Sequence, residues 1–362
     1  MSKVSSDMEI NGLNVYSDML ISREYDAVYS SDGSICRDFF LERKDELIIQ
    51  KNPPDALSFQ SPAFVKANND LNIKSALWIK WLNFDHFGHL LTETISSVWP
   101  LLSEQNHCID NNALILIPSR QALRGIEKLK IIFPEKEMRL LSVADLERPI
   151  VECEQLMLAE QSMINKMYID DMHFVNVRKF LDRYMRYYLK VDLDSTVISL
   201  PASYSQYIRS NNPNNRKNIY LSRSLLPERK RLFDDEVEIE NELLSRGWCI
   251  VHLEKLPLNI QLQILSEANS IAGARGSAFH LLMALDSGLL KNKKIFFLNK
   301  QNKPRKKIKD TFEVQFDAQK LDYQNLRCLV RYVEIDHQYP RIRLADNFLI
   351  SDIVKQIDFI KT

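Results

Sequence analysis

Histidines and acidic residues that could move a proton gather in the stretch NFDHFGHLLTETISSVWPLL, residues 83–102. His89 and Glu93 are four residues apart, so a helix would place both side chains on one face, near His86. A histidine or carboxylate whose pKa is tuned by burial can take the proton of a hydroxyl group as that group attacks a substrate. We therefore predict a catalytic or acceptor-orienting pair, in which Glu93 either is the base or holds the tautomer of His89; Asp85 is a third candidate.

Two other interpretations of this helix face remain open. The face is solvated and has no task, or it binds a metal ion through His86, His89 and Glu93. The HExxH spacing is absent, however, and no fourth ligand is indicated. The sequence also lacks a clear DxD pair, because the adjacent Asp170 and Asp171 fit a helix cap better. We expect neither a metal ion nor a cofactor.

A second group of candidate residues lies in IAGARGSAFHLLMALDSG, residues 271–288, which holds three of the eight glycines of the chain. We interpret it as a strand, a turn and a helix, in which Gly273 and Gly276 permit a tight turn or a close approach to a ligand. Ser277 would cap the helix, and Arg275 adds a planar cation. Helix starts of this kind bind phosphate. The alternative is a turn whose glycines serve packing alone.

Two further arginines support the phosphate interpretation. Arg223 follows an expected strand at the sheet edge where open α/β sheets bind ligands, and Arg231 comes shortly after it. Together with Arg275 they could converge on a diphosphate, and Gln261 lies on the helix between the two groups. Each arginine taken singly also fits a solvated surface charge.

The hydrophobic pattern predicts the scaffold that would position these residues, an α/β fold of alternating strands and helices with parallel sheets. In the first half we expect strands at 75–83, 112–119 and 151–160 and helices at 85–104, 120–133 and 171–191. In the second half we expect strands at 218–224, 248–254, 270–274 and 294–299 and helices at 234–248, 257–269 and 276–288. Residues 1–70 are expected to form an irregular N-terminal layer.

The Ser-, Asn- and Pro-rich residues 201–218 predict a domain boundary. We expect an N-terminal domain at 1–200, a C-terminal domain at 201–343, and an amphipathic helix in 344–362 that packs back on the N-terminal domain.

The stretch 218–288 resembles the C-terminal half of glycosyltransferase family 61. The matching residues are Ser222-Arg223, Arg231, Asp235-Glu236, Gly247, Gln261 and Gly273-x-Arg275-Gly276. The family usually has a histidine where this chain has Arg275, a change that a cation facing a phosphate would survive. Residues 83–102 are similar to the other signature of the family, with His89 and Glu93 at the matching positions.

This resemblance implies a GT-B fold, two Rossmann-like domains that face a cleft. It implies metal-independent, inverting transfer of a sugar from a nucleotide sugar to a glycan or glycolipid acceptor, as in the synthesis of bacterial capsule or lipopolysaccharide. The N-terminal domain would hold the acceptor and the base. The C-terminal domain would bind the donor through Arg223, Arg231, Gln261, Gly273, Arg275, Gly276 and Ser277.

Composition limits the remaining possibilities. Forty-eight basic residues balance forty-eight acidic ones, and the basic stretch 300–309 fits a solvated loop, so we expect no nucleic-acid partner. Five scattered cysteines without a CxxC pair indicate reduced thiols. With no signal peptide or membrane span apparent, we expect a cytoplasmic protein, with peripheral contact at the inner membrane face left open. A non-catalytic nucleotide- or glycan-binding module is the alternative to an enzyme.

Overall fold

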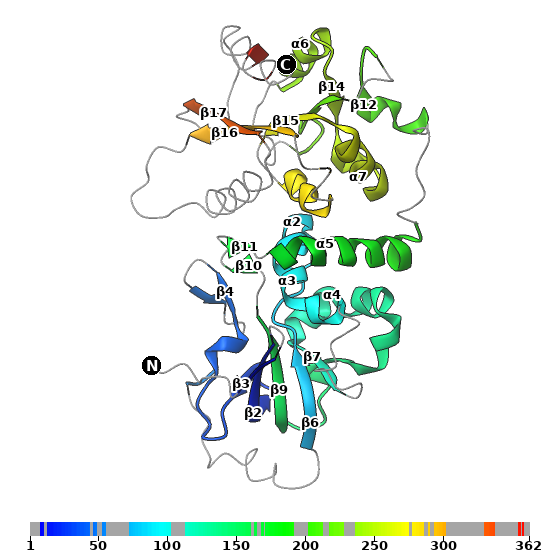
Figure 1. Cartoon of the computed structure of the whole chain (residues 1–362). Helices are drawn as coiled ribbons and strands as arrows, with labels where there is room; N and C mark the ends of the chain where they lie inside the picture. Colours follow the sequence, from blue (N-terminus) through cyan, green and yellow to red (C-terminus); the bar gives the residue numbers. More distant parts are fainter. Residues whose placement is uncertain are drawn as a thin grey trace. The chain divides into compact units, whose positions relative to one another are not determined.

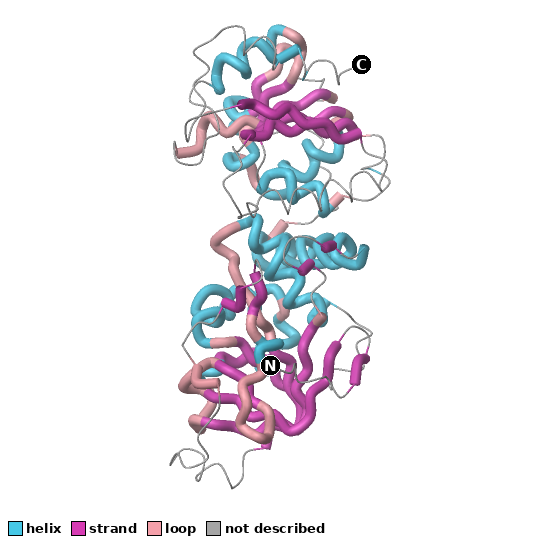
Figure 2. Tube along the Cα trace, turned by 90° about the vertical axis from the view of Figure 1, so that its left-hand side faces the viewer, coloured by secondary structure: helices cyan, strands magenta, loops and turns pink. Residues whose placement is uncertain are grey.

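The computed structural model describes most of the chain: residues 8–10, 13–43, 46–48, 53–55, 72–102, 113–160, 163–164, 168–169, 171–191, 202–212, 217–227, 236–274, 277–285, 289, 293–301, 329–336, 354–355 and 357. The chain divides into two compact units, residues 1–190 and 191–362, which Figure 1 shows in blue to green and in green to red. Each unit is a mixed α/β structure with a sheet rich in parallel strands. Figure 2 shows the strands of each unit lined by helices.

The sheet of the first unit contains four parallel strands in the order β9-β6-β7-β8. They are β6 (Asn72–Trp78), β7 (Leu114–Ile117), β8 (Leu140–Ser142) and β9 (Ile150–Ala159). β7 lies on one side of β6 and β9 lies on the other, so the direction of winding reverses between β6 and β9. Ligands of open α/β sheets bind outside the carboxyl ends of the strands at such a point.

Helices connect these strands. The first helical segment, residues 87–102, follows β6 and leads to β7. α4 (Ser119–Ile132) connects β7 to the short helix η4 (Pro134–Arg139) and β8, and α5 (Asp171–Arg183) follows β9 and continues as η6 (Tyr184–Leu189). β6, β7, β9 and the helices at 87–102, 119–132 and 171–189 thus fall close to the expected ranges, whereas β8 and η4 were not expected.

The N-terminal segment corrects one expectation, because residues 13–29 are not an irregular layer. β2 (Leu13–Ser22) pairs antiparallel with β9 along almost its whole length, and β1 (Met8–Ile10) and β3 (Ala27–Tyr29) pair with the other edge of β2. β4 (Leu41–Arg43) and β5 (Glu46–Ile48) form a separate hairpin. Asp18 has a φ of 53°, a left-handed conformation that interrupts the alternation of side chains along β2. The alternating hydrophobic pattern that would predict a strand is therefore broken in the sequence.

The sheet of the second unit has the order β12-β14-β13-β15-β16-β17, in which the last five strands are parallel. Their bounds are β12 (Ile208–Arg209), β13 (Asn218–Leu221), β14 (Cys249–Val251), β15 (Ser270–Ala274), β16 (Lys294–Gln301) and β17 (Leu329–Asp336). The parallel strands follow the doubly wound order of a Rossmann-like fold, with the reversal between β13 and β15. Two strands of this sheet were not predicted: the antiparallel edge strand β12 lies in the expected linker, and the parallel strand β17 lies in a stretch to which the sequence assigned no structure.

Helices lie on both faces of this second sheet (Figure 1). α6 (Glu236–Ser245) ends before Gly247, whose φ of 79° is the left-handed conformation that commonly follows the end of a helix. α7 (Leu258–Glu267) starts after Pro257, and the segment after β15 is the 3-10 helix η10 (Ser277–Ala284), not the expected α-helix.

The core between α6 and the sheet also contains the described part of the C-terminal segment. Val354 and Ile357 are fully buried there, against residues such as Tyr220, Leu243 and Phe296. At these two positions the segment packs on the second unit, and not on the first as we expected from the sequence.

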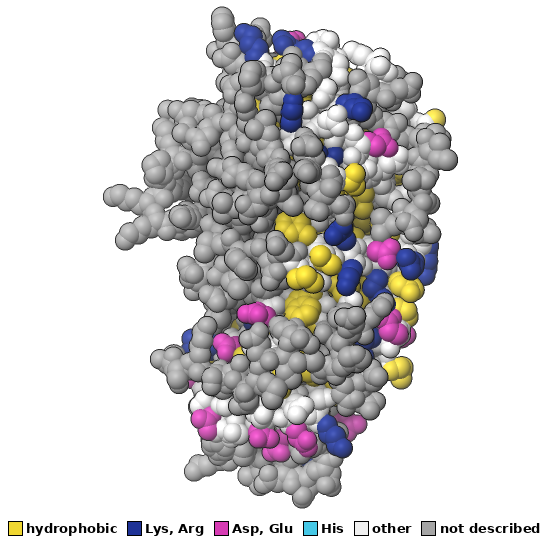
Figure 3. All heavy atoms as spheres, viewed as in Figure 1, with side chains coloured by type: hydrophobic (Ala, Val, Ile, Leu, Met, Phe, Trp, Pro, Cys, Tyr) yellow, Lys and Arg dark blue, Asp and Glu magenta, His cyan; other side chains and the backbone are white. Residues whose placement is uncertain are grey.

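The described surface side chains and the cysteine thiols do not indicate a further functional site. On the face drawn in Figure 3, the described Lys and Arg side chains are interspersed with Asp, Glu and hydrophobic side chains. Cys36, Cys153 and Cys249 are buried, and burial raises the pKa of the Cys153 thiol to about 12. No helix among the described residues has the length and apolar character to cross a bilayer.

Candidate active site

The first candidate group lies on a helical segment whose hydrogen-bonding pattern changes along its length. A short α-helix, α2 (Phe87–His89), widens into the π-helix η2 (Leu90–Thr94) and returns to α3 (Ile95–Val98). The segment ends as the 3-10 helix η3 (Trp99–Leu102), which contains Pro100. A π segment inside an α-helix is rare and is frequently found at functional sites.

Neighbouring side chains satisfy the carbonyl groups that the wider turn leaves. The Thr92 hydroxyl donates to the carbonyl of Gly88 at 2.8 Å, and the Ser97 hydroxyl donates to the carbonyl of Glu93 at 3.0 Å. The buried ring of His173, from α5, lies 3.0 Å from the carbonyl of Leu91. Side chains of the segment itself and of α5 thus bond to its backbone carbonyl groups.

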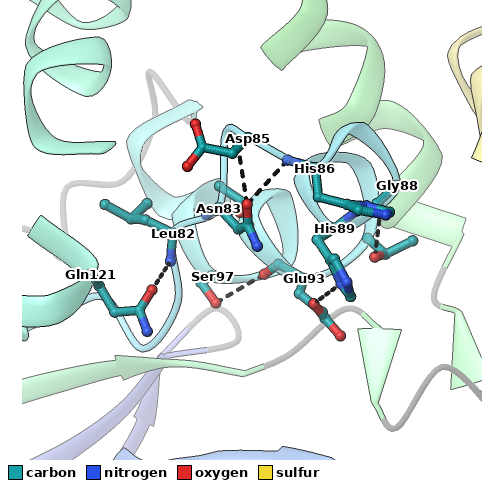
Figure 4. A network of polar contacts seen from close by, with 11 residues as sticks. Leu82, Asn83, Asp85, His86, Gly88, His89, Glu93, Ser97 and Gln121 are labelled. Carbon is teal, nitrogen blue, oxygen red and sulfur yellow. Dashed lines mark hydrogen bonds and ion pairs between the residues drawn. The ribbon is translucent and has the colours of Figure 1, made fainter. Parts of the chain in front are cut away.

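His89 and Glu93 are in direct contact, as their spacing predicted. His89 Nδ1 and Glu93 Oε2 are 2.5 Å apart (Figure 4). The side chain of Glu93 is 8% exposed and that of His89 is 18% exposed. The acid is thus buried behind the imidazole, which excludes the interpretation of a fully solvated polar face.

This arrangement can produce a base. When Nδ1 is protonated and donates to the carboxylate, the other ring nitrogen, Nε2, carries the free lone pair. A carboxylate in this position also stabilises the imidazolium that forms when Nε2 takes a proton. The geometry therefore suits a base at His89 that Glu93 orients.

Asp85 does not join this pair. Figure 4 shows it projecting away from His89 and Glu93, and its side chain is 73% exposed and 3.5 Å from Lys128 Nζ. The backbone N–H groups of Asp85 and His86 both donate to the Asn83 side chain, which forms the turn before the helix. The expectation that Asp85 is a catalytic candidate is thus not supported by a contact with the pair.

His86 lies next to His89. Its Nδ1 accepts the backbone N–H of His89 at 3.4 Å, and the two rings are 4.4 Å apart. In the part of the chain that the structure describes, no three His, Cys, Asp or Glu side chains are grouped as a metal site requires.

Two described residues of the second candidate group, Arg223 and Gly273, lie at the carboxyl ends of β13 and β15, where the winding of the second sheet reverses. Leu221 of β13 is paired with Gly273 of β15, and Arg223 follows two residues later. A Cβ atom at position 273 would lie 2.7 Å from the carbonyl oxygen of Leu221. Gly273 therefore permits the close approach of two strands inside the sheet; it is not the turn residue that we expected.

The rest of the predicted donor group is only partly described. Arg231, Arg275 and Gly276 lie outside the described residues, and Ser277 is the first residue of η10. Gln261 donates its side-chain N–H to the carbonyl of Leu256 at 2.7 Å, a contact within the start of α7 and not with Arg223 or Gly273.

Two acidic residues hold the turn around Arg223; the sequence named Glu236 only as a position that matches the family pattern, and it gave Glu240 no role. Glu236 Oε1 accepts the hydroxyl of Tyr220 at 2.9 Å and the backbone N–H of Arg223 at 3.2 Å. Glu240 Oε1 accepts the Ser222 hydroxyl at 2.6 Å, and its Oε2 lies 2.7 Å from Arg209. Glu236 and Glu240 are both 1% exposed. The sequence signal that could have indicated them is their spacing of four residues, which places both acids on one face of a helix. Acids that are buried on such a face are rare unless they are paired.

Comparison with known proteins identifies the family. No curated protein matches this chain significantly. Residues 87–291, more than half of the chain, match the family described as Glycosyltransferase 61. The matched region begins within the helical segment of His89 and Glu93 and extends past Arg223, Gly273 and η10. The chain therefore belongs to glycosyltransferase family 61.

Proposed function

We propose that the protein is a metal-independent, inverting glycosyltransferase that moves a sugar from a nucleotide sugar to a glycan or glycolipid acceptor. The observation that carries this proposal is the 2.5 Å contact between His89 Nδ1 and the buried Glu93, inside the region that matches the family. In this proposal the unit 1–190 binds the acceptor, the unit 191–362 binds the donor, and the two have the roles of the domains of a GT-B fold.

His89 is the base in this proposal. The acceptor oxygen attacks the anomeric carbon, its proton moves to His89 Nε2, and the bond from the anomeric carbon to the diphosphate oxygen breaks. The nucleoside diphosphate leaves with the electron pair of that bond. Glu93 holds the tautomer of His89 and stabilises the imidazolium.

The leaving diphosphate is met by cations in this proposal. Arg223 lies at the reversal point of the second sheet, where ligands of doubly wound folds bind. We propose that Arg231, Arg275 and the backbone from Gly276 to Ser277 complete the phosphate site, that Gln261 contributes from α7, and that the close packing at Gly273 brings the two strand ends together. Arginine side chains and a helix start can neutralise this charge without a metal ion.

A role in surface polysaccharide synthesis in the bacterial cytoplasm, with contact at the inner membrane face, would bring the enzyme to a glycolipid acceptor. This part of the proposal rests on the resemblance to family 61. The nucleotide sugar and the acceptor are its substrates, and no other cofactor takes part.

The test is release of UDP or GDP from a panel of nucleotide sugars in the presence of bacterial glycolipid and polysaccharide fractions. The Arg223→Ala variant should raise the donor KM about 10- to 100-fold, because hydrogen bonds to charged groups contribute about 1.5–3 kcal/mol. Arg246→Ala is the matched control, because Arg246 pairs with Glu242 on the far end of α6. Donor binding without turnover would indicate a non-catalytic module, and wild-type kinetics in Arg223→Ala would overturn the donor site.

A further inference from the structure

Two buried acids lie beneath the turn that carries Arg223. Glu236 and Glu240 occupy the first turns of α6, and each of them accepts a hydrogen bond from the segment Ser222–Arg223. Ser222 in turn accepts the backbone N–H of Ser224 at 3.0 Å, and its own N–H donates to the carbonyl of Val251. The backbone on both sides of Arg223 is therefore fixed by contacts to α6 and β14.

Glu236 differs from Glu240 in its surroundings. Glu240 pairs with Arg209, whereas Glu236 Oε2 has no hydrogen-bond partner among the described residues. Burial raises the pKa of Glu236 to about 7, although the Tyr220 hydroxyl, the Arg223 N–H and the charge of Arg223 act in the opposite direction. The acid therefore changes its charge near neutral pH.

Arg223 and Glu236 also affect each other directly. Burial lowers the pKa of Arg223, and the charge of Glu236 is the largest influence that opposes this, followed by that of Glu254. The guanidinium still remains charged, since the pKa of arginine lies far above neutral. Glu236 thus accepts the backbone N–H of Arg223, and its charge is the acidic influence that raises the pKa of Arg223 most.

We propose that Glu236 is a positioning residue for Arg223, which orients the turn that carries the guanidinium and takes up a proton when the donor diphosphate binds. This inference rests on the proposed function, because it takes Arg223 as a ligand of the diphosphate.

The charges around the turn give the reason for proton uptake. Glu236 is the acid whose charge acts most strongly on Arg223. Protonation of Glu236 removes one negative charge from the surroundings of the Arg223 guanidinium, and this favours an anionic ligand. By linkage, a bound diphosphate raises the pKa of Glu236, and donor affinity falls as the pH rises through about 7.

The other groups that face this network do not replace Glu236. Tyr220 is fully buried, and burial raises its pKa well above the ordinary value, so it stays protonated. His252, after β14, is affected by Glu240 and Arg209, and burial lowers its pKa, so it is mostly neutral at pH 7.5. Glu254 is exposed, whereas Glu236 is buried, and partial desolvation raises the pKa of Glu254 above its ordinary value. His252→Gln and Glu254→Gln are therefore the variants that separate these groups from Glu236.

One arm of the experiment needs no donor. The carboxyl 13C resonance of Glu236, assigned with Glu236→Gln, is followed from pH 5 to pH 9. We expect a midpoint near pH 7 in the wild type and a higher midpoint in Arg223→Ala, because the positive charge of Arg223 stabilises the ionised acid. A midpoint in the ordinary range of glutamate, or one that Arg223→Ala leaves unchanged, would overturn the coupling between the two residues.

The second arm measures binding of UDP-glucose, UDP-N-acetylglucosamine and GDP-mannose by calorimetry at pH 7.5 in buffers of different ionisation enthalpy. The wild type should take up a fraction of a proton, and its affinity should fall between pH 6.5 and pH 8.5, by at most about tenfold per pH unit for one linked proton. Glu236→Gln should bind without proton uptake and with a flat pH profile, while its kcat changes less than its KM.

Control variants make the result specific. Glu238→Gln removes an exposed acid from the same turn of α6 and should behave as the wild type. Uptake that persists in Glu236→Gln, or that disappears in His252→Gln or Glu254→Gln, would overturn the proposal. If none of the three nucleotide sugars binds the wild type and none in the full panel turns over, the proposed function is wrong. The proposed proton uptake on donor binding is then wrong as well. The 13C titration still tests the electrostatic coupling between Glu236 and Arg223 on its own.

Discussion

A methyl group at Gly273 has no room in the structure. Gly273 of β15 is paired with Leu221 of β13, and the Cβ of an alanine would lie 2.7 Å from the Leu221 carbonyl oxygen and 3.1 Å from its Cβ. Ordinary contacts begin at 3.4 Å, so the two strands would have to part by about 0.7 Å. The atom that must move is backbone, which relaxes less easily than the end of a flexible side chain.

The expected cost of Gly273→Ala follows from this displacement. Overpacking of this kind costs about 1–3 kcal/mol, and the lower freedom of alanine in the unfolded chain returns about 0.4–1 kcal/mol. We expect a net loss of about 1–2 kcal/mol and a Tm lower by about 3–6 °C for a unit of this size. Because misplacement by about 1 Å can cost about 100-fold in activity, we also expect the donor KM to rise at least about tenfold.

The assay combines thermal unfolding with donor KM from nucleotide release. Ala272→Gly is the matched control, since it removes a buried methyl group from the same strand and costs about 1–2 kcal/mol without pressing on Leu221. It should lower Tm by a similar amount and leave KM unchanged. An unchanged Tm and KM in Gly273→Ala, or an equal rise of KM in both variants, would refute the reasoning.

Two further predictions concern acids whose roles the structure separates. Asp85→Asn should keep kcat within about twofold in the nucleotide-release assay, because Asp85 is exposed and paired with Lys128; a loss on the scale of a general base, about 100-fold or more, would return it to the catalytic group. Glu236→Gln should change the dependence of stability on pH. The raised pKa of Glu236 means that its contribution to stability is fully present below about pH 4.5 and is lost as pH rises to about 7. Relative to the variant, the wild type should lose on the order of 3 kcal/mol of unfolding free energy over that window in urea titrations, and parallel pH profiles would contradict the assignment.

The alternation of strands and helices was predictable because it depends on local hydrophobic patterns. The apolar run of β7 and the helical spacing of α4 each point to one structure without help from the rest of the chain. β2 was missed because its pairing partner, β9, follows more than a hundred residues later and because Asp18 breaks its alternation. Long-range pairing of this kind leaves no signal in a local window.

The contact between His89 and Glu93 could be predicted from the sequence, whereas the residues that surround and support the candidate site could not. The spacing of His89 and Glu93 indicated their contact, yet the π turn at Leu90–Thr94 and the burial of Glu93 depend on tertiary contacts such as that of His173. Gly273 was recognised as special, but its reason is the close approach of Leu221 from a strand fifty residues earlier. The support of Arg223 by Glu236 and Glu240 likewise exists only once α6 packs on the sheet.

The measurement that tests the central claim most directly is kcat for Glu93→Gln at saturating donor and acceptor, followed by nucleotide release. If His89 accepts the acceptor proton and Glu93 orients it and stabilises its charge, kcat should fall about 100- to 10,000-fold, while donor binding and the unfolding transition stay close to those of the wild type. A Glu93→Gln enzyme that folds, binds donor and turns over at the wild-type rate would contradict the account.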